Sequence, residues 1–385
     1  LIPYNLRVAY GLTTITHQVS VYAYYFYRLL QRAEKITLVY NEKMEGLNRG
    51  EMSRFMLQYE LESGQSIHKT SVSPTISPIV SETIEVKKDE AMLRKLENQR
   101  NGKIHFFSPT SINCYLDCPL KFYFTYIAGM KEEETVSSVV DPRYFGNIFH
   151  RTAQLLYQDR INRSILKTDL EELLKSRSEI ERCVSRAFNE KFFQLPAEAK
   201  ANYNGEQLIK REILLQYVRQ LLHCDMDNAP FTLLYLEKDL ALPLDITFAE
   251  NKPYHIYVGG QIDRMDKVII EGTEHIRIVD YKTGGSEQTV KSVEQLFTPA
   301  EKRPDKIFQT FFYSFLTYEQ DGTRNIAPAL FFVHKSAAKD YSPLLKMNRQ
   351  IINFDNYEQE FRERLLQLFT EIFTVNIPFK QTEIH

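Results

Sequence analysis

Two apolar runs that each contain acidic residues constrain what this chain can fold into. Asp263 lies in the first run, and the second run, residues 276–282, ends in Asp280-x-Lys282. A Gly-containing turn at residues 271–273 predicts an antiparallel hairpin, which makes the two strands neighbours. Because residues two apart on a strand share a face, Asp280 and Lys282 are expected to project together, close to Asp263.

A carboxylate pair and an ammonium group on one face of a sheet suit metal-assisted hydrolysis of phosphodiesters. Oxygen ligands bind a hard ion such as Mg²⁺, and a lysine can orient or help to deprotonate the attacking water. Taken alone, an Asp-x-Lys pattern is more often a solvated ion pair worth at most about 1 kcal/mol. The metal hypothesis therefore depends on residues elsewhere in the chain.

Composition bounds the class of protein. The chain has 385 residues, which exceeds the usual single-domain size, and its 43% hydrophobic and 25% charged residues are typical of globular proteins. The 48 basic and 50 acidic side chains give a net charge of −2, so any nucleic-acid binding requires a local basic surface. No apolar run reaches the roughly 18 residues of a membrane span, and no signal-peptide pattern opens the chain. We expect a soluble, cytoplasmic protein, and the start at Leu1 rather than Met suggests a piece of a longer chain.

Composition also divides the chain into three segments. Residues 1–62 contain two helical stretches and a short apolar strand candidate at 36–40. Residues 63–88 are rich in Ser, Thr and Pro, and residues 63–103 are interpreted as a linker that includes a short charged helix at 89–99. Residues 104–385 are expected to form the main domain.

Helices precede strands in the main domain. The expected helices cover residues 108–126 with a break at Cys118-Pro119, then 146–160, 169–193, 207–224, 307–316 and 357–373, and the expected strands cover 233–240, 255–263, 276–282 and 329–334. This order predicts an α/β sandwich with a mixed central sheet.

Polar residues on two predicted helices could complete the site. His150 follows Gly146 by four positions and lies off the apolar stripe of its helix, so it is either a satisfied helix histidine or a ligand. Gln309 and Tyr313 lie one turn apart on an otherwise apolar helix, where an amide and a phenol could hold a phosphate or steady the lysine. Alone, such a pair is more often surface decoration.

The four cysteines give little support for a metal cluster. Cys114 and Cys118 form a Cys-x3-Cys pair, whereas Cys183 and Cys224 stand apart. One close pair is weak evidence for a zinc or iron–sulfur site, and buried free thiols are favoured.

The order of these polar residues along the chain is informative. The ordered set is Gly146-x3-His150, Gly260-x2-Asp263, Asp280-x-Lys282 and Gln309-x3-Tyr313. This order resembles the RecB-like branch of the PD-(D/E)xK nuclease superfamily, over roughly residues 104–335, and residues 108–122 are similar to the opening helix of that branch. The resemblance implies a restriction-endonuclease-like α/β core, in which helices flank a mixed central sheet, with a helical N-terminal appendage.

The resemblance also implies a role for each site residue. His150, Asp263 and Asp280 would be side-chain metal ligands, and the carbonyl of Tyr281 would add an oxygen. Lys282 would act on the nucleophilic water. The implied ion is Mg²⁺, with Mn²⁺ as a substitute.

Other polar residues have less defined roles. Gln309 and Tyr313 are implied to support the lysine and the DNA backbone near the cut. Arg264 and Asp266 either support the ligands or form an ion pair on the far face of the strand, and the structural role is favoured. Basic residues that could contact phosphates, or could simply be solvated, are Lys302, Arg303, Lys306, His334, Lys335 and Lys339.

The first hundred residues point to a subtype. Residues 24–40 resemble the end of the helicase-like region of AddB-type proteins, which process broken DNA ends with a helicase-nuclease partner. Many AddB-type nucleases hold an iron–sulfur cluster through one cysteine before the nuclease core and three after it. Cys118 stands where the first would be, but no cysteine follows Tyr313. We therefore expect no cluster, and Cys118 is expected to be a buried thiol.

These implications favour a Mg²⁺-dependent deoxyribonuclease, with an exonuclease as the favoured subtype, in DNA end processing and double-strand break recombination repair. The expected partners are DNA and a helicase-nuclease subunit. One alternative is a nuclease-fold module that grips DNA or a helicase partner as a scaffold without cutting. A metabolic enzyme that uses Asp263 and Asp280 as an acid–base pair is a third hypothesis, but no cofactor motif supports it.

Overall fold

The computed structural model consists of two units, Leu1–Val80 and Ser81–His385, each of which is described by itself. The structure describes residues 4–41, 44–45, 48–49, 51–72, 83–97, 99–100, 103–104, 107–130, 140–248, 251–286, 288–338 and 341–382. Among these residues, no helix is long and apolar enough to cross a membrane. Lys339, one of the predicted phosphate contacts, lies outside the described residues.

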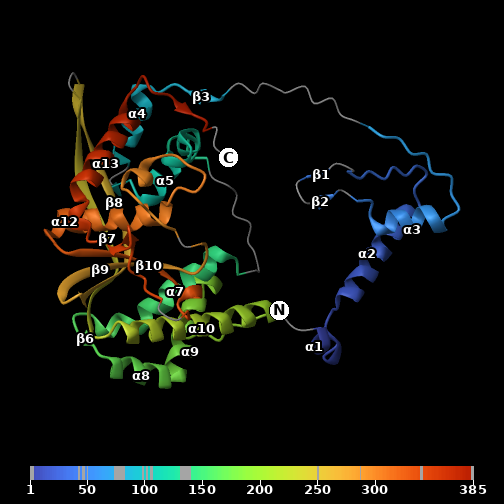
Figure 1. Ribbon diagram of the computed structural model, residues 1–385, viewed down its shortest axis with the longest axis horizontal. Helices are drawn as coiled ribbons and strands as arrows, with labels where there is room; N and C mark the ends of the chain where they lie inside the picture. The colour runs from blue at the N-terminus through green and yellow to red at the C-terminus, as the bar shows by residue number, and fades with distance from the viewer. Residues whose placement is uncertain are drawn as a thin grey trace. The chain divides into compact units, whose positions relative to one another are not determined.

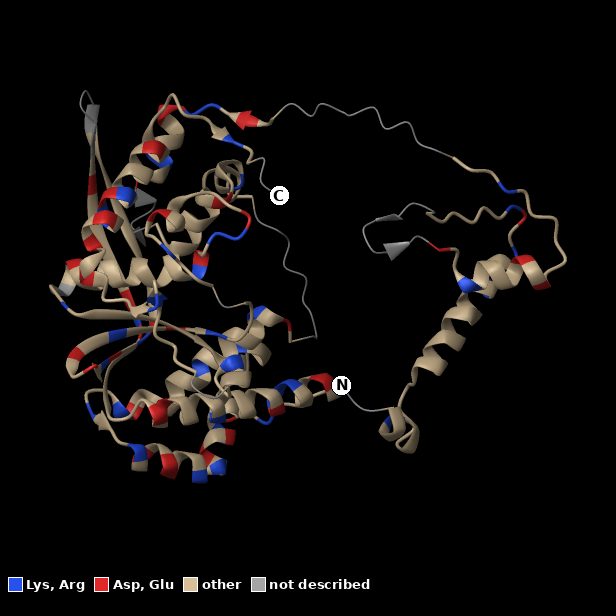
Figure 2. Cartoon of the chain, in the orientation of Figure 1, with Lys and Arg blue, Asp and Glu red and all other residues tan. Residues whose placement is uncertain are grey.

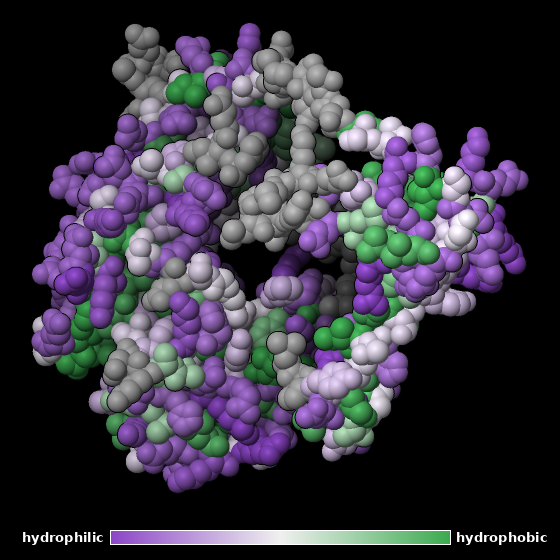
Figure 3. Space-filling view, turned by 45° about the vertical axis from the view of Figure 1, so that its right-hand side comes forward, coloured by the Kyte–Doolittle hydropathy of each residue, from purple (hydrophilic) through white to green (hydrophobic). Residues whose placement is uncertain are grey.

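The helices of the smaller unit have no buried face in the part of the chain that the structure describes. Its elements are α1 (Tyr4–Ala9), α2 (Ile15–Leu30), α3 (Arg54–Glu62) and a hairpin of β1 (Met44–Glu45) with β2 (Asn48–Arg49). None of the residues of the three helices is buried. Hydrophobic residues therefore lie open on the surface of this unit (Figure 3).

The predicted strand at residues 36–40 is wrong. These residues are described and have no regular secondary structure. A strand is stable only when its backbone groups pair with a neighbour, and the described part of the unit pairs no strand with this segment. An apolar run alone was therefore not enough to predict a strand at residues 36–40.

A five-stranded sheet organises the larger unit. Its strands, in spatial order, are β10 (Ile326–Phe332), β9 (Thr273–Lys282), β8 (Asn251–Ile270), β7 (Phe231–Phe248) and β6 (Ser164–Ile165). β10 runs parallel to β9, and the other neighbours are antiparallel. The mixed sheet confirms the predicted fold class.

The predicted hairpin between the two acidic strands is also present. β8 and β9 are joined by Glu271 and Gly272, and Ile270 pairs with Thr273. The two turn residues have φ angles of 50° and 82°. Positive φ at both central positions is the signature of the type I′ turn, whose twist matches that of the flanking strands.

Helices cover both faces of the sheet (Figure 1). On one face lie α7 (Pro142–Tyr157), α8 (Lys167–Lys175), α9 (Arg177–Phe188) and α10 (Gly205–Asp227), and on the other lie α4 (Glu90–Leu96), α5 (Pro109–Asp117), α12 (Asp305–Asp321) and α13 (Glu358–Phe373). Each face has its own apolar core. The predicted helices are therefore present, and the region expected to be helical at 169–193 is divided into α8, α9 and a π-helical turn.

The remaining elements are short. They are α6 (Pro119–Phe122), the π-helical turns Tyr123–Ile127 and Asn189–Phe193, α11 (Glu294–Phe297), the 3₁₀ turns Gln158–Arg160, Val333–Lys335 and Phe354–Asn356, and the paired strands β3 (Glu85–Val86) with β13 (Phe379–Lys380), β4 (Gln99–Arg100) with β5 (Lys103–Ile104), and β11 (Lys346–Met347) with β12 (Gln350–Ile351).

The helix expected to open the main domain has the predicted break. Ser108 caps α5, because its hydroxyl accepts a hydrogen bond from the N–H of Ser111 while the Ser111 hydroxyl accepts one from the N–H of Ser108. The helix ends before Pro119, where the extended backbone of Cys118 starts the short α6. α5 lies beside the N-terminal turn of α12, where the Asn113 amide donates to the carbonyl of Asp305.

Candidate active site

The site begins where β8 and β9 separate. Their last paired residues are Arg264 and Val279. One step further, the N–H of Tyr281 donates to Oδ2 of Asp263 at 2.7 Å instead of to a backbone carbonyl of β8. The carboxylate of Asp263 thus occupies the space between two diverging strands and is fixed by a backbone donor.

The side chains of β8 also stop alternating regularly between the two faces of the sheet at this point. Ile262 and Met265 contribute to the same core although they are three positions apart, whereas a regular strand would place them on opposite faces. Glu237 lies between the paired residues on the neighbouring β7 and has a φ of 49°. This local irregularity brings two carboxylates, those of Glu237 and Asp263, to one place.

His150 reaches the same place from α7. Its Nδ1 lies 3.2 Å from Oδ1 of Asp263 and 4.0 Å from Oε1 of Glu237. Its Nε2 lies 3.2 Å from the backbone carbonyl oxygen of Tyr281. The half-buried imidazole therefore bridges the side chain of β8 and the backbone of β9.

These residues form a donor set that fits a divalent cation. One ligand atom from each of His150, Glu237 and Asp263 lies within 4.8 Å of the others. A neutral imidazole and two carboxylates are ligands that suit Mg²⁺ or Mn²⁺, and such a cation would offset the charge that the buried carboxylates concentrate here. The donor set therefore fits the metal that the family resemblance implies.

Glu237 was missed by the sequence analysis. It lies inside the predicted strand 233–240, directly after the apolar run at residues 233–236. A carboxylate that interrupts an apolar strand is a signal that could have identified it, since buried acidic side chains are rare unless they are paired or bind a metal.

Asp280 is placed differently from the other acids. It is buried, and its Oδ2 lies 2.7 Å from Nζ of Lys282, so in this structure its nearest charged partner is the lysine. Burial raises the pKa of Asp280 to about 6, with Asp263 adding to the effect and Lys282 opposing it. The structure thus places Asp280 beside the candidate cation ligands, in an ion pair with Lys282.

A chain of hydrogen bonds holds Lys282 from the other side. Nζ of Lys282 donates to Oε1 of Gln309 at 3.0 Å, and Nε2 of Gln309 donates to the hydroxyl of Tyr313 at 3.2 Å. Gly260 makes room for this arrangement, because a Cβ there would lie 2.8 Å from Cε1 of Tyr313. Both residues of the predicted Gln-x3-Tyr pair therefore face the site from α12.

The electrostatics of the group follow from burial and proximity. Burial raises the pKa of Glu237 to about 7, and the nearby Asp263 adds to the shift. Burial opposes the charged form of His150, but Asp263 overcomes this and raises the pKa of His150 to about 9. Burial likewise opposes ionisation of Asp263, yet His150 and the Tyr281 N–H hold the pKa of Asp263 below its usual range. Without a cation, a protonated His150 therefore offsets the charge of Asp263.

Arg264 and Asp266 are buried on the face of the sheet that α7 and α10 cover, opposite the face on which Lys282 meets α12. Arg264 contacts Asp225 and Asp266, each at 2.7 Å, and Arg277 contacts Asp266 at 2.8 Å. Arg264 and Asp266 thus form the predicted ion pair on the far face of the strand.

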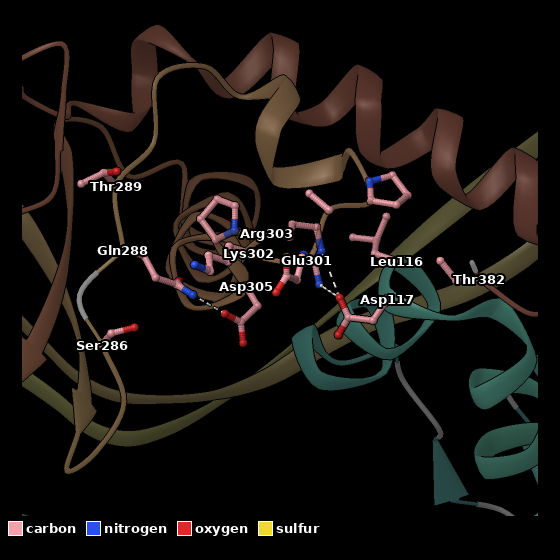
Figure 4. Close-up of a pocket in the computed structure, with 13 residues that line it drawn as sticks. Leu116, Asp117, Ser286, Gln288, Thr289, Glu301, Lys302, Arg303, Asp305 and Thr382 are labelled. Atoms are coloured by element: carbon pink, nitrogen blue, oxygen red, sulfur yellow. Dashed lines mark hydrogen bonds and ion pairs between the residues drawn. The ribbon is translucent and has the colours of Figure 1, made fainter. Parts of the chain in front are cut away.

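The prediction that Arg303 contacts phosphate is wrong. A cavity of about 660 Å³ lies beside the N-terminus of α12, and Arg303 forms part of its wall (Figure 4). The guanidinium is buried and donates to Asp117, Asn113 and the carbonyl of Leu296. It fixes the segment before α12 to α5 and has no donor left for a ligand. Lys302 lines the same cavity and is exposed.

The cysteines are free thiols. Cys183 and Cys224 are buried, whereas Cys114 and Cys118 are half-buried. The expectation of a buried Cys118 was therefore only partly correct, because Cys118 lies at the chain break between α5 and α6.

Basic and acidic residues are interspersed along the helices of the described part of the larger unit, as the cartoon coloured by charge shows (Figure 2). This distribution agrees with the near-zero net charge of the chain. Any interaction with a polyanion would therefore depend on a small local surface.

Comparison with known proteins identifies the family. Residues 106–383 match the family model of the PD-(D/E)XK nuclease superfamily. Over 208 residues the chain is 24% identical to an ATP-dependent helicase/deoxyribonuclease subunit from Clostridium perfringens (strain SM101 / Type A), and the match covers 52% of this chain and 17% of that protein. The chain thus spans about a sixth of the length of this curated relative.

The matched region contains the whole site, from His150 on α7 to Tyr313 on α12, together with the mixed sheet that supports it. Its fold, its ordered motifs and the family model agree. The chain belongs to the PD-(D/E)XK nuclease superfamily.

Proposed function

We propose that this chain is a Mg²⁺-dependent deoxyribonuclease, and specifically an exonuclease. The observation that carries the proposal is the convergence of His150, Asp263 and Lys282 at the point where β8 and β9 separate. His150 of α7 meets two residues of the distant β8–β9 hairpin there, in the order typical of the family.

His150, Glu237 and Asp263 would hold the cation, and we propose the carbonyl of Tyr281 and the second oxygen of Asp280 as further ligands. When bound, the cation would polarise the phosphate and lower the pKa of a bound water. Tyr281 contributes a second time, since its N–H fixes the carboxylate of Asp263 at 2.7 Å.

Lys282 would orient the attacking water and neutralise charge on the phosphate. Burial opposes its ammonium form, but Asp280 outweighs burial and holds the pKa of Lys282 above its usual range. Gln309 accepts a hydrogen bond from this ammonium group and is itself steadied by Tyr313. The lysine is thus held as a fixed donor, which is the geometry that favours a developing charge in the transition state.

The biological setting is also part of the proposal. The relative from Clostridium perfringens is called a helicase/deoxyribonuclease subunit, which supports DNA end processing and double-strand break recombination repair in the cytoplasm, with a helicase-nuclease partner. Residues 1–62 would be the end of a helicase-like region. The linker would be shorter than the predicted 63–103, because the larger unit begins at Ser81 and Leu93 and Leu96 of α4 pack into its core. The nuclease domain would accordingly include α4 and begin before the predicted residue 104. No iron–sulfur cluster is proposed.

The test is cleavage of linear DNA in Mg²⁺ by the chain and by two variants, Asp280→Ala and Lys282→Ala. Each variant should lose at least about a hundredfold in rate, because each removes a charged group that acts in the transition state. Lys267→Ala is the matched control, since Lys267 pairs with Glu274 on the exposed part of the same hairpin. Wild-type rates in both site variants would contradict the proposal.

The alternative of a module that binds without cutting makes a different prediction in the same experiment. The wild-type chain would then retain DNA in a binding assay, while added Mg²⁺ would cause no cleavage. The observation that supports this alternative is the ion pair between Asp280 and Lys282, since two proposed catalytic side chains contact each other in this structure.

A further inference from the structure

A buried network of charged groups lies behind the site, on the face of the sheet covered by α7 and α10. Arg264, Asp266 and Arg277 are each at most 2% exposed, and Asp225 is 4% exposed. Both oxygens of Asp266 accept hydrogen bonds from Arg277, and one of them also accepts from Arg264. Two arginines and two aspartates make the network electrically balanced.

Asp225 extends this network to the helix that carries His150. Oδ2 of Asp225, on α10, accepts a hydrogen bond from the hydroxyl of Tyr157 at 2.6 Å and another from Nη1 of Arg264 at 2.7 Å. Tyr157 follows His150 by seven residues, which is two turns along α7 and nearly the same helical face. One carboxylate oxygen thus joins α7 to β8.

Tyr281 extends the network to the end of β9. Nη1 of Arg264 lies 3.4 Å from the Tyr281 hydroxyl, and the Tyr281 ring packs edge-on against the ring of His150 with centroids 5.8 Å apart. The backbone of the same residue donates to Asp263 and lies against Nε2 of His150. Tyr281 therefore has its side chain in the network and its backbone in the site.

We propose that Tyr157, Asp225, Arg264 and the Tyr281 hydroxyl are positioning residues, which set the distance between α7 and the end of β9 and thereby hold His150 and Asp263 in register around a divalent cation. This inference rests on the proposed function, since it assumes that the donor set binds Mg²⁺ or Mn²⁺. The physical basis is that hard cations demand narrow ligand distances, so groups behind the ligands affect affinity.

A purely structural role for the network makes a different prediction, and variants that remove a single hydroxyl separate the two. Tyr157→Phe and Tyr281→Phe keep the ring and its packing while they remove one hydroxyl contact each. Tyr115→Phe is the matched control, because the Tyr115 hydroxyl also donates to a carboxylate, that of Glu371, at 2.8 Å on the other face of the sheet.

The experiment is a calorimetric titration of the full chain with Mn²⁺, together with thermal unfolding without metal. We expect the dissociation constant for Mn²⁺ to rise about tenfold in Tyr157→Phe and less in Tyr281→Phe, whose contact is longer, while Tyr115→Phe binds like the wild type. Raising the Mn²⁺ concentration should restore the DNA cleavage rate of Tyr157→Phe to the wild-type value.

The outcomes are distinguishable. If Tyr157→Phe unfolds at a lower temperature but binds Mn²⁺ like the wild type, the network is only structural and the inference is overturned, while the proposed function stands. If the wild-type chain itself binds no Mn²⁺, both the proposed function and the inference are overturned.

Discussion

Glu237 shows at the scale of one residue how the fold is strained to build the site. A non-glycine residue at a φ of 49° is uncommon and costs about 1–3 kcal/mol, which the surrounding sheet must offset. Its carboxylate is moreover half-buried beside Asp263, and this partial burial together with Asp263 raises the pKa of Glu237 to about 7. The positive φ angle and the raised pKa both destabilise the fold without metal. Both are expected at a residue that holds a cation.

Replacing this carboxylate by its neutral isostere tests its role. Glu237→Gln should weaken Mn²⁺ binding about tenfold or more, because a charged ligand is lost. The folded-state pKa lies above the unfolded value of 4.5, so the stability of the metal-free fold falls as the pH rises from about 4.5 to about 7, and the full loss remains at pH 8. Glu237→Gln should therefore unfold at the same or a higher temperature than the wild type at pH 8 without metal.

Glu274→Gln serves as the control for Glu237→Gln, since Glu274 is exposed on the same hairpin. Calorimetry and thermal unfolding measure the two effects separately. Unchanged Mn²⁺ affinity in Glu237→Gln would show that Glu237 is not a ligand.

The remaining site residues could be predicted because each belongs to a spaced motif. Gln309 and Tyr313 share a helical face by simple periodicity, and Lys282 follows its aspartate at strand spacing. The sequence marks Glu237 only as a carboxylate that interrupts an apolar run. Its place in the site depends on the broken alternation of β7 and β8, which no local pattern shows. The ion pair of Asp280 with Lys282 likewise depends on how far β9 diverges from β8.

At the scale of elements, β7 and β8 are much longer than predicted. The ladder continues to the pairing of Phe248 with Asn251, past Pro243 and Gly259, which are weak strand formers. Pairing between the two strands stabilises these residues where local propensity does not. The reverse holds for residues 36–40, which have strand propensity but no partner strand in the described part of their unit.

The segment before α4 is attached to α13 through a buried lysine. Nζ of Lys88 donates to the carbonyl of Glu371 at 2.9 Å and lies 4.7 Å from the centroid of the Phe379 ring. Burial lowers the pKa of Lys88 to about 8, and Glu371 opposes the shift. This contact therefore makes the attachment depend on pH.

The sign of the pH effect follows from linkage. Between about pH 8 and 10.5 the folded state has lost the Lys88 proton that the unfolded state still binds, so stability rises with pH in this window. Relative to Lys88→Met, the free energy of unfolding of the wild type should rise by roughly 1–2 kcal/mol from pH 7.5 to 10, allowing for solvent screening. Urea denaturation at both pH values measures this difference.

Lys95→Met is the control for Lys88→Met, because Lys95 lies exposed on the neighbouring α4. Its stability difference from the wild type should not depend on pH in this window. Parallel pH curves for the wild type and Lys88→Met would contradict the proposed burial of the charge.

At the scale of the whole molecule, the two units differ in how they are stabilised. The larger unit has an apolar core on each side of its sheet. The smaller unit exposes large apolar side chains, among them Tyr22, Tyr24, Tyr25 and Leu29. A segment that buries so little apolar surface gains little to offset its conformational entropy. This supports the proposal that residues 1–62 belong to a larger helicase-like region.

The central claim is that a divalent cation binds where β8 and β9 separate, and Mn²⁺ located by its anomalous scattering in crystals of the chain tests it most directly. The account predicts one ion within about 2.0–2.3 Å of an imidazole nitrogen of His150 and of carboxylate oxygens of Asp263 and Glu237. An ion bound elsewhere, with these three side chains still paired to each other, would contradict it.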